Sequence, residues 1–151
     1  MSNLIMINDY NNLILSNEKL ALEEILKLNE LTSKQNLTLT REQAISLVNN
    51  RNYNLKEKGR IEVGSGILDK IIYEFYDSPY LDKESYAESL EELTNIFYQY
   101  QCDFDYKLTD EQIIRYMKKH FNNSCNGSTE LLESIAFEEL KNKLEKGDFY
   151  E

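Results

Sequence analysis

The segment Gly59-Arg60-Ile61-Glu62-Val63-Gly64-Ser65-Gly66 has residue types that could bind an anion. It holds three of the chain's five glycines and stands just before an apolar run that starts at Ile67. Glycine backbones can present successive N–H groups, and the first N–H groups of a helix attract phosphate or carboxylate. Arg60 could add a two-pronged hydrogen bond. The candidate ligand-binding residues are therefore Gly59, Arg60, Glu62, Gly64, Ser65 and Gly66, together with Tyr80 from the Ser78-Pro79-Tyr80 corner.

The same turn also has a purely structural interpretation. In that interpretation the glycines turn the chain, Ser65 caps the following helix, and Glu62 pairs with Arg60 or with a helix elsewhere. The Walker phosphate loop needs Lys-Ser or Lys-Thr after its last glycine, but Ile67-Leu68 stands there. The dinucleotide fingerprint needs a preceding strand of a parallel sheet, which the sequence does not indicate. The structural interpretation is favoured, and anion binding stays open as the alternative.

The other potentially reactive residues do not combine into a known catalytic or metal-binding pattern. His120 is the chain's one histidine and follows two lysines, so no Ser-His-Asp set can be argued around it. Cys102 and Cys125 match no metal or redox spacing and are predicted to be free thiols. The acidic segment 103–110 resembles the start of a calcium loop but lacks its turn glycine. We therefore expect no enzyme activity, no metal and no cofactor.

The chain's charge is unevenly distributed. Its 151 residues carry a net charge of −10, and residues 1–60 hold eight basic against seven acidic side chains, while the remainder holds nine against twenty. Direct binding to nucleic acid or to an anionic membrane is disfavoured, because both need basic surfaces. With no apolar run of about 18 residues and no basic leader, a cytoplasmic location is expected. The acidic half either serves solubility or forms a docking face for a basic partner.

Apolar spacing predicts the elements that must position these residues. Apolar side chains recur at intervals of three and four through most of the chain, which is the period of an α-helix. The predicted helices cover residues 16–31, 41–55, 67–78, 82–104, 110–121 and 129–146. Thr40 with Gln43, and Thr109 with Gln112, form capping boxes at two of the starts. The prediction is an all-α, compact bundle of five or six helices, with a very short strand pair at 37–39 and 60–63 as an additional option.

The strongest helical signal lies between residues 82 and 104. Its seam residues are Tyr86, Leu90, Leu93, Phe97, Tyr100 and Phe104, spaced alternately by four and three. Aromatic side chains are bulky for a narrow two-stranded coiled coil, so this seam is predicted to be buried within one chain, and both a monomer and a homodimer stay open. The length fits a single helical domain over 1–151, with residues 1–15 and 147–151 expected to be loosely ordered.

Five blocks of the sequence together carry a family resemblance: GRIEVGSGIL at 59–68, FYDSPY at 75–80, LEELTNIFYQYQ at 90–101, LTDEQIIRYMKKHF at 108–121 and NGSTELL at 126–132. In this order and spacing they resemble a family of small, predominantly helical bacterial proteins known as a domain of unknown function. The resemblance spans residues 37–140 and implies a helical protein with no assigned activity. The family-pattern positions that it implies are Gly59, Arg60, Ile61, Glu62, Gly64, Ser78, Pro79, Tyr80, Phe97 and Tyr98.

Two classes of function follow from these observations. The first is a protein-interaction or adaptor module that docks another protein through its acidic carboxy-terminal helices and exposed tyrosines, because tyrosine is common in protein interfaces. The alternative is a protein that binds a small anionic ligand where the turn at 59–66 and Tyr80 converge in a pocket between helices. An acidic mimic of nucleic acid is a third and weaker idea.

Overall fold

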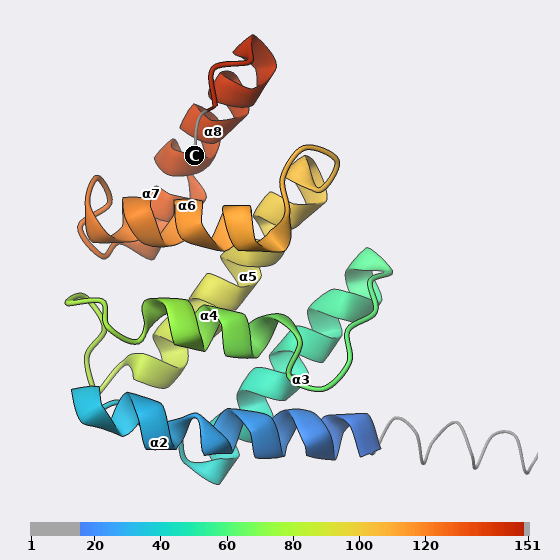
Figure 1. Ribbon diagram of the computed structural model, residues 1–151, viewed down its shortest axis with the longest axis vertical. Coiled ribbons are helices and arrows are strands. Elements are labelled where there is room, and N and C mark those ends of the chain that lie inside the picture. Colours follow the sequence, from blue (N-terminus) through green and yellow to red (C-terminus); the bar gives the residue numbers. More distant parts are fainter. Residues whose placement is uncertain (1–15, 150–151) are drawn as a thin grey trace, which may run out of the picture.

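The computed structural model describes residues 16–149, and all regular secondary structure within them is helical (Figure 1). The first helix covers residues 16–27 of the described part, and the others are α2 (Asn29–Thr32), the 3-10 helix η1 (Ser33–Gln35), α3 (Arg41–Lys58), α4 (Ile67–Phe75), α5 (Tyr86–Phe104), α6 (Asp110–Asn122), α7 (Thr129–Glu133) and α8 (Ile135–Lys146). If α2 is counted with the helix before it, and α7 with α8, the described chain forms six helical units. The predicted all-α bundle is confirmed.

The optional strand pair at 37–39 and 60–63 does not form. The side-chain amide of Asn29 donates to the Leu39 carbonyl and accepts from the Leu39 N–H, both at 2.9 Å. These two backbone groups of Leu39 are therefore bonded to a helix residue and not to a second strand. In the second segment Ile61 and Val63 are 91% and 72% exposed. The side chains therefore point in the directions opposite to those that a strand pattern predicts. The apolar Ile61 and Val63 face solvent, and the charged Glu62 faces inward.

Helix starts follow the local hydrogen-bonding signals. Both predicted capping boxes, at Thr40 and Thr109, are present with reciprocal side-chain bonds. Helix α5 begins at Tyr86, four residues later than predicted. The reason is a turn in which Asp82 Oδ1 accepts hydrogen bonds from the Ser85 N–H at 2.9 Å and from the Ser85 hydroxyl at 2.8 Å. Local side-chain bonds of this kind compete with helix formation.

Helix α5 is the central element of the bundle and packs against α3, α4, α6 and α7. All six seam residues are at most 4% exposed within this one chain, which confirms the prediction of an intramolecular seam. Ile96 and Tyr98 are equally buried, so α5 is covered on more than the seam face. Several aromatic rings of α5 meet their neighbours edge to face, as between Tyr100 and Phe137, whose centroids are 5.2 Å apart. Such pairs add to the stabilisation that comes from area burial.

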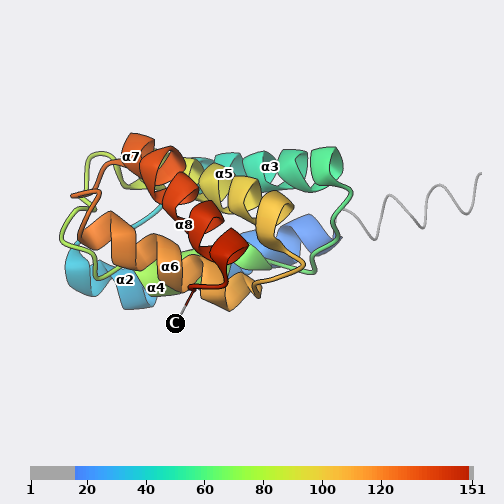
Figure 2. The ribbon, with the colours of Figure 1, turned by 90° about the horizontal axis from the view of Figure 1, so that it is seen from above.

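The helix predicted at 129–146 is divided at Ser134 into α7 and α8. Ser128 caps α7, and the Ser134 hydroxyl donates to the Glu130 carbonyl at 2.8 Å. Two buried tyrosines anchor the two sides of the bend, because the Tyr100 hydroxyl donates to the Leu132 carbonyl and the Tyr116 hydroxyl to the Ala136 carbonyl, both at 2.6 Å. Figure 2 shows α7 leading into α8, which lies next to α5.

The carboxy-terminal residues that the structure describes are attached to the bundle. The Asp148 N–H donates to the Lys143 carbonyl at 2.8 Å, and the Phe149 ring lies 6.3 Å from that of Tyr116. The predictions for residues 1–15 and 150–151 lie outside the described residues. Among the helices of residues 16–149, none combines the length and the apolar character needed to cross a bilayer.

Candidate functional site

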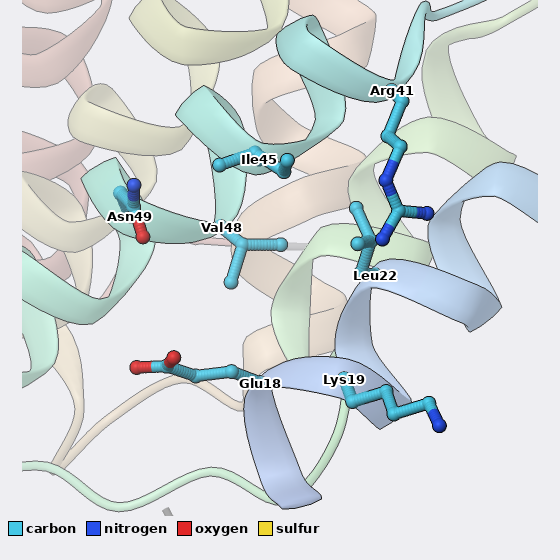
Figure 3. Close-up of a pocket in the computed structure, with 7 residues that line it drawn as sticks. All are labelled: Glu18, Lys19, Leu22, Arg41, Ile45, Val48 and Asn49. Atoms are coloured by element: carbon cyan, nitrogen blue, oxygen red, sulfur yellow. The ribbon is translucent and has the colours of Figure 1, made fainter. Parts of the chain in front are cut away.

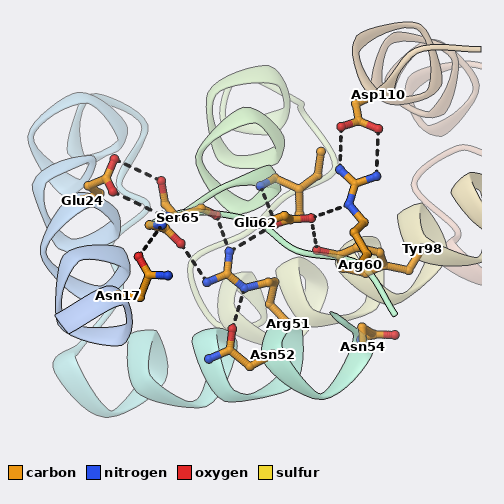
Figure 4. Close-up of polar contacts among 12 residues, drawn as sticks. Asn17, Glu24, Arg51, Asn52, Asn54, Arg60, Glu62, Ser65, Tyr98 and Asp110 are labelled. Atoms are coloured by element: carbon orange, nitrogen blue, oxygen red, sulfur yellow. Dashed lines mark hydrogen bonds and ion pairs between the residues drawn. The ribbon is translucent and has the colours of Figure 1, made fainter. Parts of the chain in front are cut away.

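Glu62 lies at the centre of a polar cluster formed by the turn at 59–66 (Figure 4). Its Oε1 accepts from Arg51 Nη1 at 3.2 Å and from the Ile67 N–H at 3.0 Å. Its Oε2 accepts from the Tyr98 hydroxyl at 2.7 Å and from Arg60 Nε at 2.9 Å. The side chain is only 6% exposed. The carboxylate is thus satisfied on both oxygens, and it bonds to the helix-start N–H group that attracts anions at the beginning of α4.

Arg51 connects this cluster to α3. Its side chain is 3% exposed, and besides Glu62 it donates to the Ser65 carbonyl at 2.9 Å, the Gly64 carbonyl at 2.8 Å and Asn52 Oδ1 at 2.8 Å. A buried cation is tolerated when its donors are paired, and here both the charge and the turn carbonyls are matched. Arg51 therefore fixes the backbone of the turn onto α3.

Arg60 connects the turn to α6. Its guanidinium donates to both carboxylate oxygens of Asp110, at 3.2 and 2.6 Å, and lies 5.7 Å from the centroid of the Phe97 ring. Burial by itself lowers the pKa of Arg60, but the hydrogen bonds and charges of Asp110 and Glu62 raise that pKa overall. The side chain is 22% exposed. Its two-pronged bond is therefore made within the chain, to the first turn of a neighbouring helix.

Ser65 does not cap α4, contrary to the structural interpretation above, because its hydroxyl faces the helix of residues 16–27 and donates to Glu24 at 3.3 Å. The cap residue is Gly66, with φ of +51°. A Cβ atom at this position would collide with the Glu62 side chain, so glycine is needed both for the backbone conformation and for the space. The predicted pairing of Glu62 with Arg60 is present.

Tyr80 is not brought to the cluster around Glu62. Its hydroxyl donates to Asn126 Oδ1 at 3.3 Å, and its ring packs on Phe121 at the far end of α6. The neighbouring Ser78 hydroxyl donates to Asn122 at 2.6 Å. The length of α4, roughly 13 Å at about 1.5 Å per residue, separates this corner from the turn at 59–66. The other six candidate residues lie together in that turn, and anion binding there stays the alternative interpretation.

Sequence reasoning missed Glu24, Arg51 and Asp110 as partners that complete the cluster, and it named Tyr98 only as a family-pattern position. One signal was available for Arg51, since it continues the apolar stripe of Leu47, Val48 and Leu55 at helical spacing. A charged residue on an apolar stripe needs a buried partner. No local pattern identifies which partner that is, because Glu62 stands eleven positions away across a helix end.

We expect Arg60→Ala to lower the free energy of unfolding by about 1.5 to 3 kcal/mol, because it removes charge-assisted bonds to two partly buried carboxylates. Urea titration measures this loss. If Arg60 were exposed for binding, the change would stay within about 1 kcal/mol. Ile61→Ala is the matched control on the adjacent, exposed side chain, and it should change stability by less than about 0.5 kcal/mol. Equal small losses in both variants would contradict a structural role for Arg60.

A second feature lies where α7 and α8 meet α5. Two adjoining grooves, of about 440 and 450 Å³, share Gln99 and Glu133 in their walls. We call their union the acidic groove, and its carboxylates are Glu92, Glu130, Glu133, Glu138 and Glu139. Its lining contains no lysine or arginine, and within residues 16–149 none of the five carboxylates forms an ion pair. Ile96, Ile135 and Phe137 supply apolar surface in the same walls.

A smaller depression of about 200 Å³ lies between the helix of residues 16–27 and α3 (Figure 3). Leu22, Ile45 and Val48 form its apolar part. Charged side chains of both signs, Glu18, Lys19 and Arg41 among them, surround it. The charges around this depression are therefore of both signs, whereas the charged side chains that line the acidic groove are all carboxylates.

The potentially reactive side chains His120, Cys102 and Cys125 lie outside both the cluster around Glu62 and the lining of the acidic groove. His120 stacks on Tyr116 with ring centroids 4.2 Å apart, and burial lowers its pKa. Cys102 is exposed and Cys125 is buried, both as free thiols. Burial raises the pKa of Cys125, which is the opposite of what a catalytic thiolate needs. Within residues 16–149 no group of three or more His, Cys, Asp or Glu side chains is arranged to hold a metal ion.

The molecule is thus a helical bundle with an internally satisfied polar centre and an acidic groove. Residues 24–149 match the model described as "Family of unknown function (DUF6323)". The chain belongs to this family. The match contains α2 to α8, the cluster around Glu62 and the whole acidic groove. No curated protein and no solved structure matches the chain.

Proposed function

We propose that the protein is a non-enzymatic adaptor that binds another protein through its acidic carboxy-terminal surface. The observation that supports this most is the acidic groove, in which five carboxylates line the walls without a lysine or arginine among them. Like charges held together on a folded surface repel each other. A basic partner would remove that repulsion, so the groove favours a partner rich in lysine or arginine.

The polar cluster around Glu62 supports the proposal, because it acts as a scaffold while the binding surface lies elsewhere. Its charged groups bind one another, so the turn at 59–66 joins α3, α4, α5 and α6 into one scaffold. The five carboxylates of the acidic groove lie elsewhere, on α5, α7 and α8, and form no ion pair within the described residues. A rigid scaffold that presents a preformed surface loses less conformational entropy on binding.

The test is affinity capture from the native cell with a charge-reversal variant. Glu130→Lys/Glu133→Lys changes the groove, and Glu23→Lys/Glu57→Lys is the matched control with two exposed glutamates in the amino-terminal half. We expect the wild type and the control to capture the same protein, identified by mass spectrometry, and the groove variant to lose it. Capture that persists in the groove variant, or a bound metabolite in place of a protein, would contradict the proposal.

A further inference from the structure

The acidic groove has an apolar wall in addition to its charge, and this limits what can fill it. The second of its two grooves is lined by Ile135 and Phe137, with Glu133, Glu138 and Glu139 around them. The Ile135 side chain is 58% exposed at the start of α8. Because Ile135 lies in the wall of the groove beside the carboxylates, its exposed side chain offers apolar contact to whatever enters the groove.

We propose that the groove receives a lysine- or arginine-rich segment of the partner that inserts one large apolar side chain against Ile135. This inference rests on the proposed function and adds the chemistry of the segment that is bound. Charge complementarity requires the basic residues, because five carboxylates would otherwise lose water without a counter-charge. The exposed Ile135 in the groove wall favours an apolar anchor, which a purely ionic ligand lacks.

The dimensions of the groove suit a segment of protein rather than an isolated cation. Along α5 the groove extends from Glu92 to Gln99, which is roughly 10 Å at about 1.5 Å per residue. It continues past the shared Gln99 and Glu133 to Asn142 of α8. Basic residues can therefore face Glu92 and Glu130 at one end and Glu138 and Glu139 at the other, with the apolar anchor between them at Ile135.

The bend at Ser134 is what brings these groups together. It turns α8 away from the line of α7, so Glu133 of α7 borders the same groove as Ile135, Glu138 and Glu139 of α8. Tyr100 and Tyr116 hold the two sides of the bend from beneath. The site is thus preformed in the free protein, and binding needs little rearrangement.

Fluorescence anisotropy with two labelled synthetic peptides tests the inference. In the first peptide lysines flank a single leucine, and in the second that leucine is replaced by serine. We expect the full chain to bind the leucine peptide at least tenfold more tightly, and Ile135→Ser to remove most of that difference. Glu130→Lys/Glu133→Lys should weaken both peptides about tenfold or more. Glu23→Lys/Glu57→Lys should change neither, and the melting temperature of Ile135→Ser should stay within about 2 °C of the wild type.

The inference would be overturned if the two peptides bound equally well. It would also be overturned if spermidine, at equal charge concentration, fully displaced the leucine peptide. Either result would show that charge alone is recognised. An unchanged preference for leucine in Ile135→Ser would also overturn it. Each of these results would refute the inference about the bound segment, but the proposed function would stand if Glu130→Lys/Glu133→Lys still loses its cellular partner. The inference and the proposed function would both fail if Glu130→Lys/Glu133→Lys changed neither the capture nor the peptide binding.

Discussion

Arg51→Leu is expected to lower the free energy of unfolding by about 3 to 5 kcal/mol, which is typical when one partner of a buried ion pair is removed. The variant takes one of four donors from Glu62 and leaves that carboxylate buried. It also removes the donors to the Gly64 and Ser65 carbonyls. Unsatisfied buried groups each add to the loss. Urea unfolding followed by circular dichroism measures the change.

Arg41→Leu is the matched control, because Arg41 is an exposed arginine in the same helix. It should change stability by less than about 0.5 kcal/mol. A loss below about 1 kcal/mol for Arg51→Leu, or equal losses for the two variants, would contradict the view that the turn is fixed to α3 by Arg51.

Phe97→Ala should also lower the free energy of unfolding by about 3 to 5 kcal/mol, through lost burial and the cavity that remains. Phe97 is fully buried on α5, its ring meets that of Tyr98 at 5.1 Å, and the guanidinium of Arg60 lies over it. Leu93→Ala, one turn earlier in the seam, should cost about 2 to 5 kcal/mol. Both values come from urea titrations with the wild type measured in parallel.

Tyr53→Ala is the control for an aromatic side chain that is 65% exposed on α3. Its effect should stay within about 0.5 kcal/mol. Losses under about 1 kcal/mol for Phe97→Ala and Leu93→Ala would mean that the seam is not the core of the bundle.

The helices could be predicted from the sequence because their signals are local. The seam on α5 repeats at three and four, and its burial follows from that period alone. The capping boxes at Thr40 and Thr109 each need only two residues three positions apart. Periodicity and caps specify where a helix exists, and they do so without knowledge of the other helices.

The bend at Ser134 could not be predicted in the same way. The apolar spacing continues through it, and the bonds that hold it come from Tyr100 on α5 and Tyr116 on α6. The acidic groove depends on this bend. The excess of acid in the carboxy-terminal part is visible in the sequence, but the position of Glu133 between two grooves is a tertiary property.

The turn at 59–66 shows why alternation can mislead. Ile61 and Val63 alternate with charged residues as in a strand, yet the charged Glu62 faces inward because Arg51, Arg60 and Tyr98 supply buried donors for it. These partners come from α3, the turn itself and α5. The sequence favoured a structural turn here and left an anion site open as the alternative, and the structure shows a carboxylate of the chain itself bonded to the start of α4.

The central claim is that the Glu62 carboxylate occupies the anion position at the start of α4 and joins the surrounding helices. The most direct test is a titration of the wild-type chain with inorganic phosphate, followed at the Ile67 backbone amide by nuclear magnetic resonance. We predict no saturable shift of this amide, because its N–H already donates to Glu62. A saturable shift confined to residues 59–67 would show that phosphate binds there and would contradict the claim.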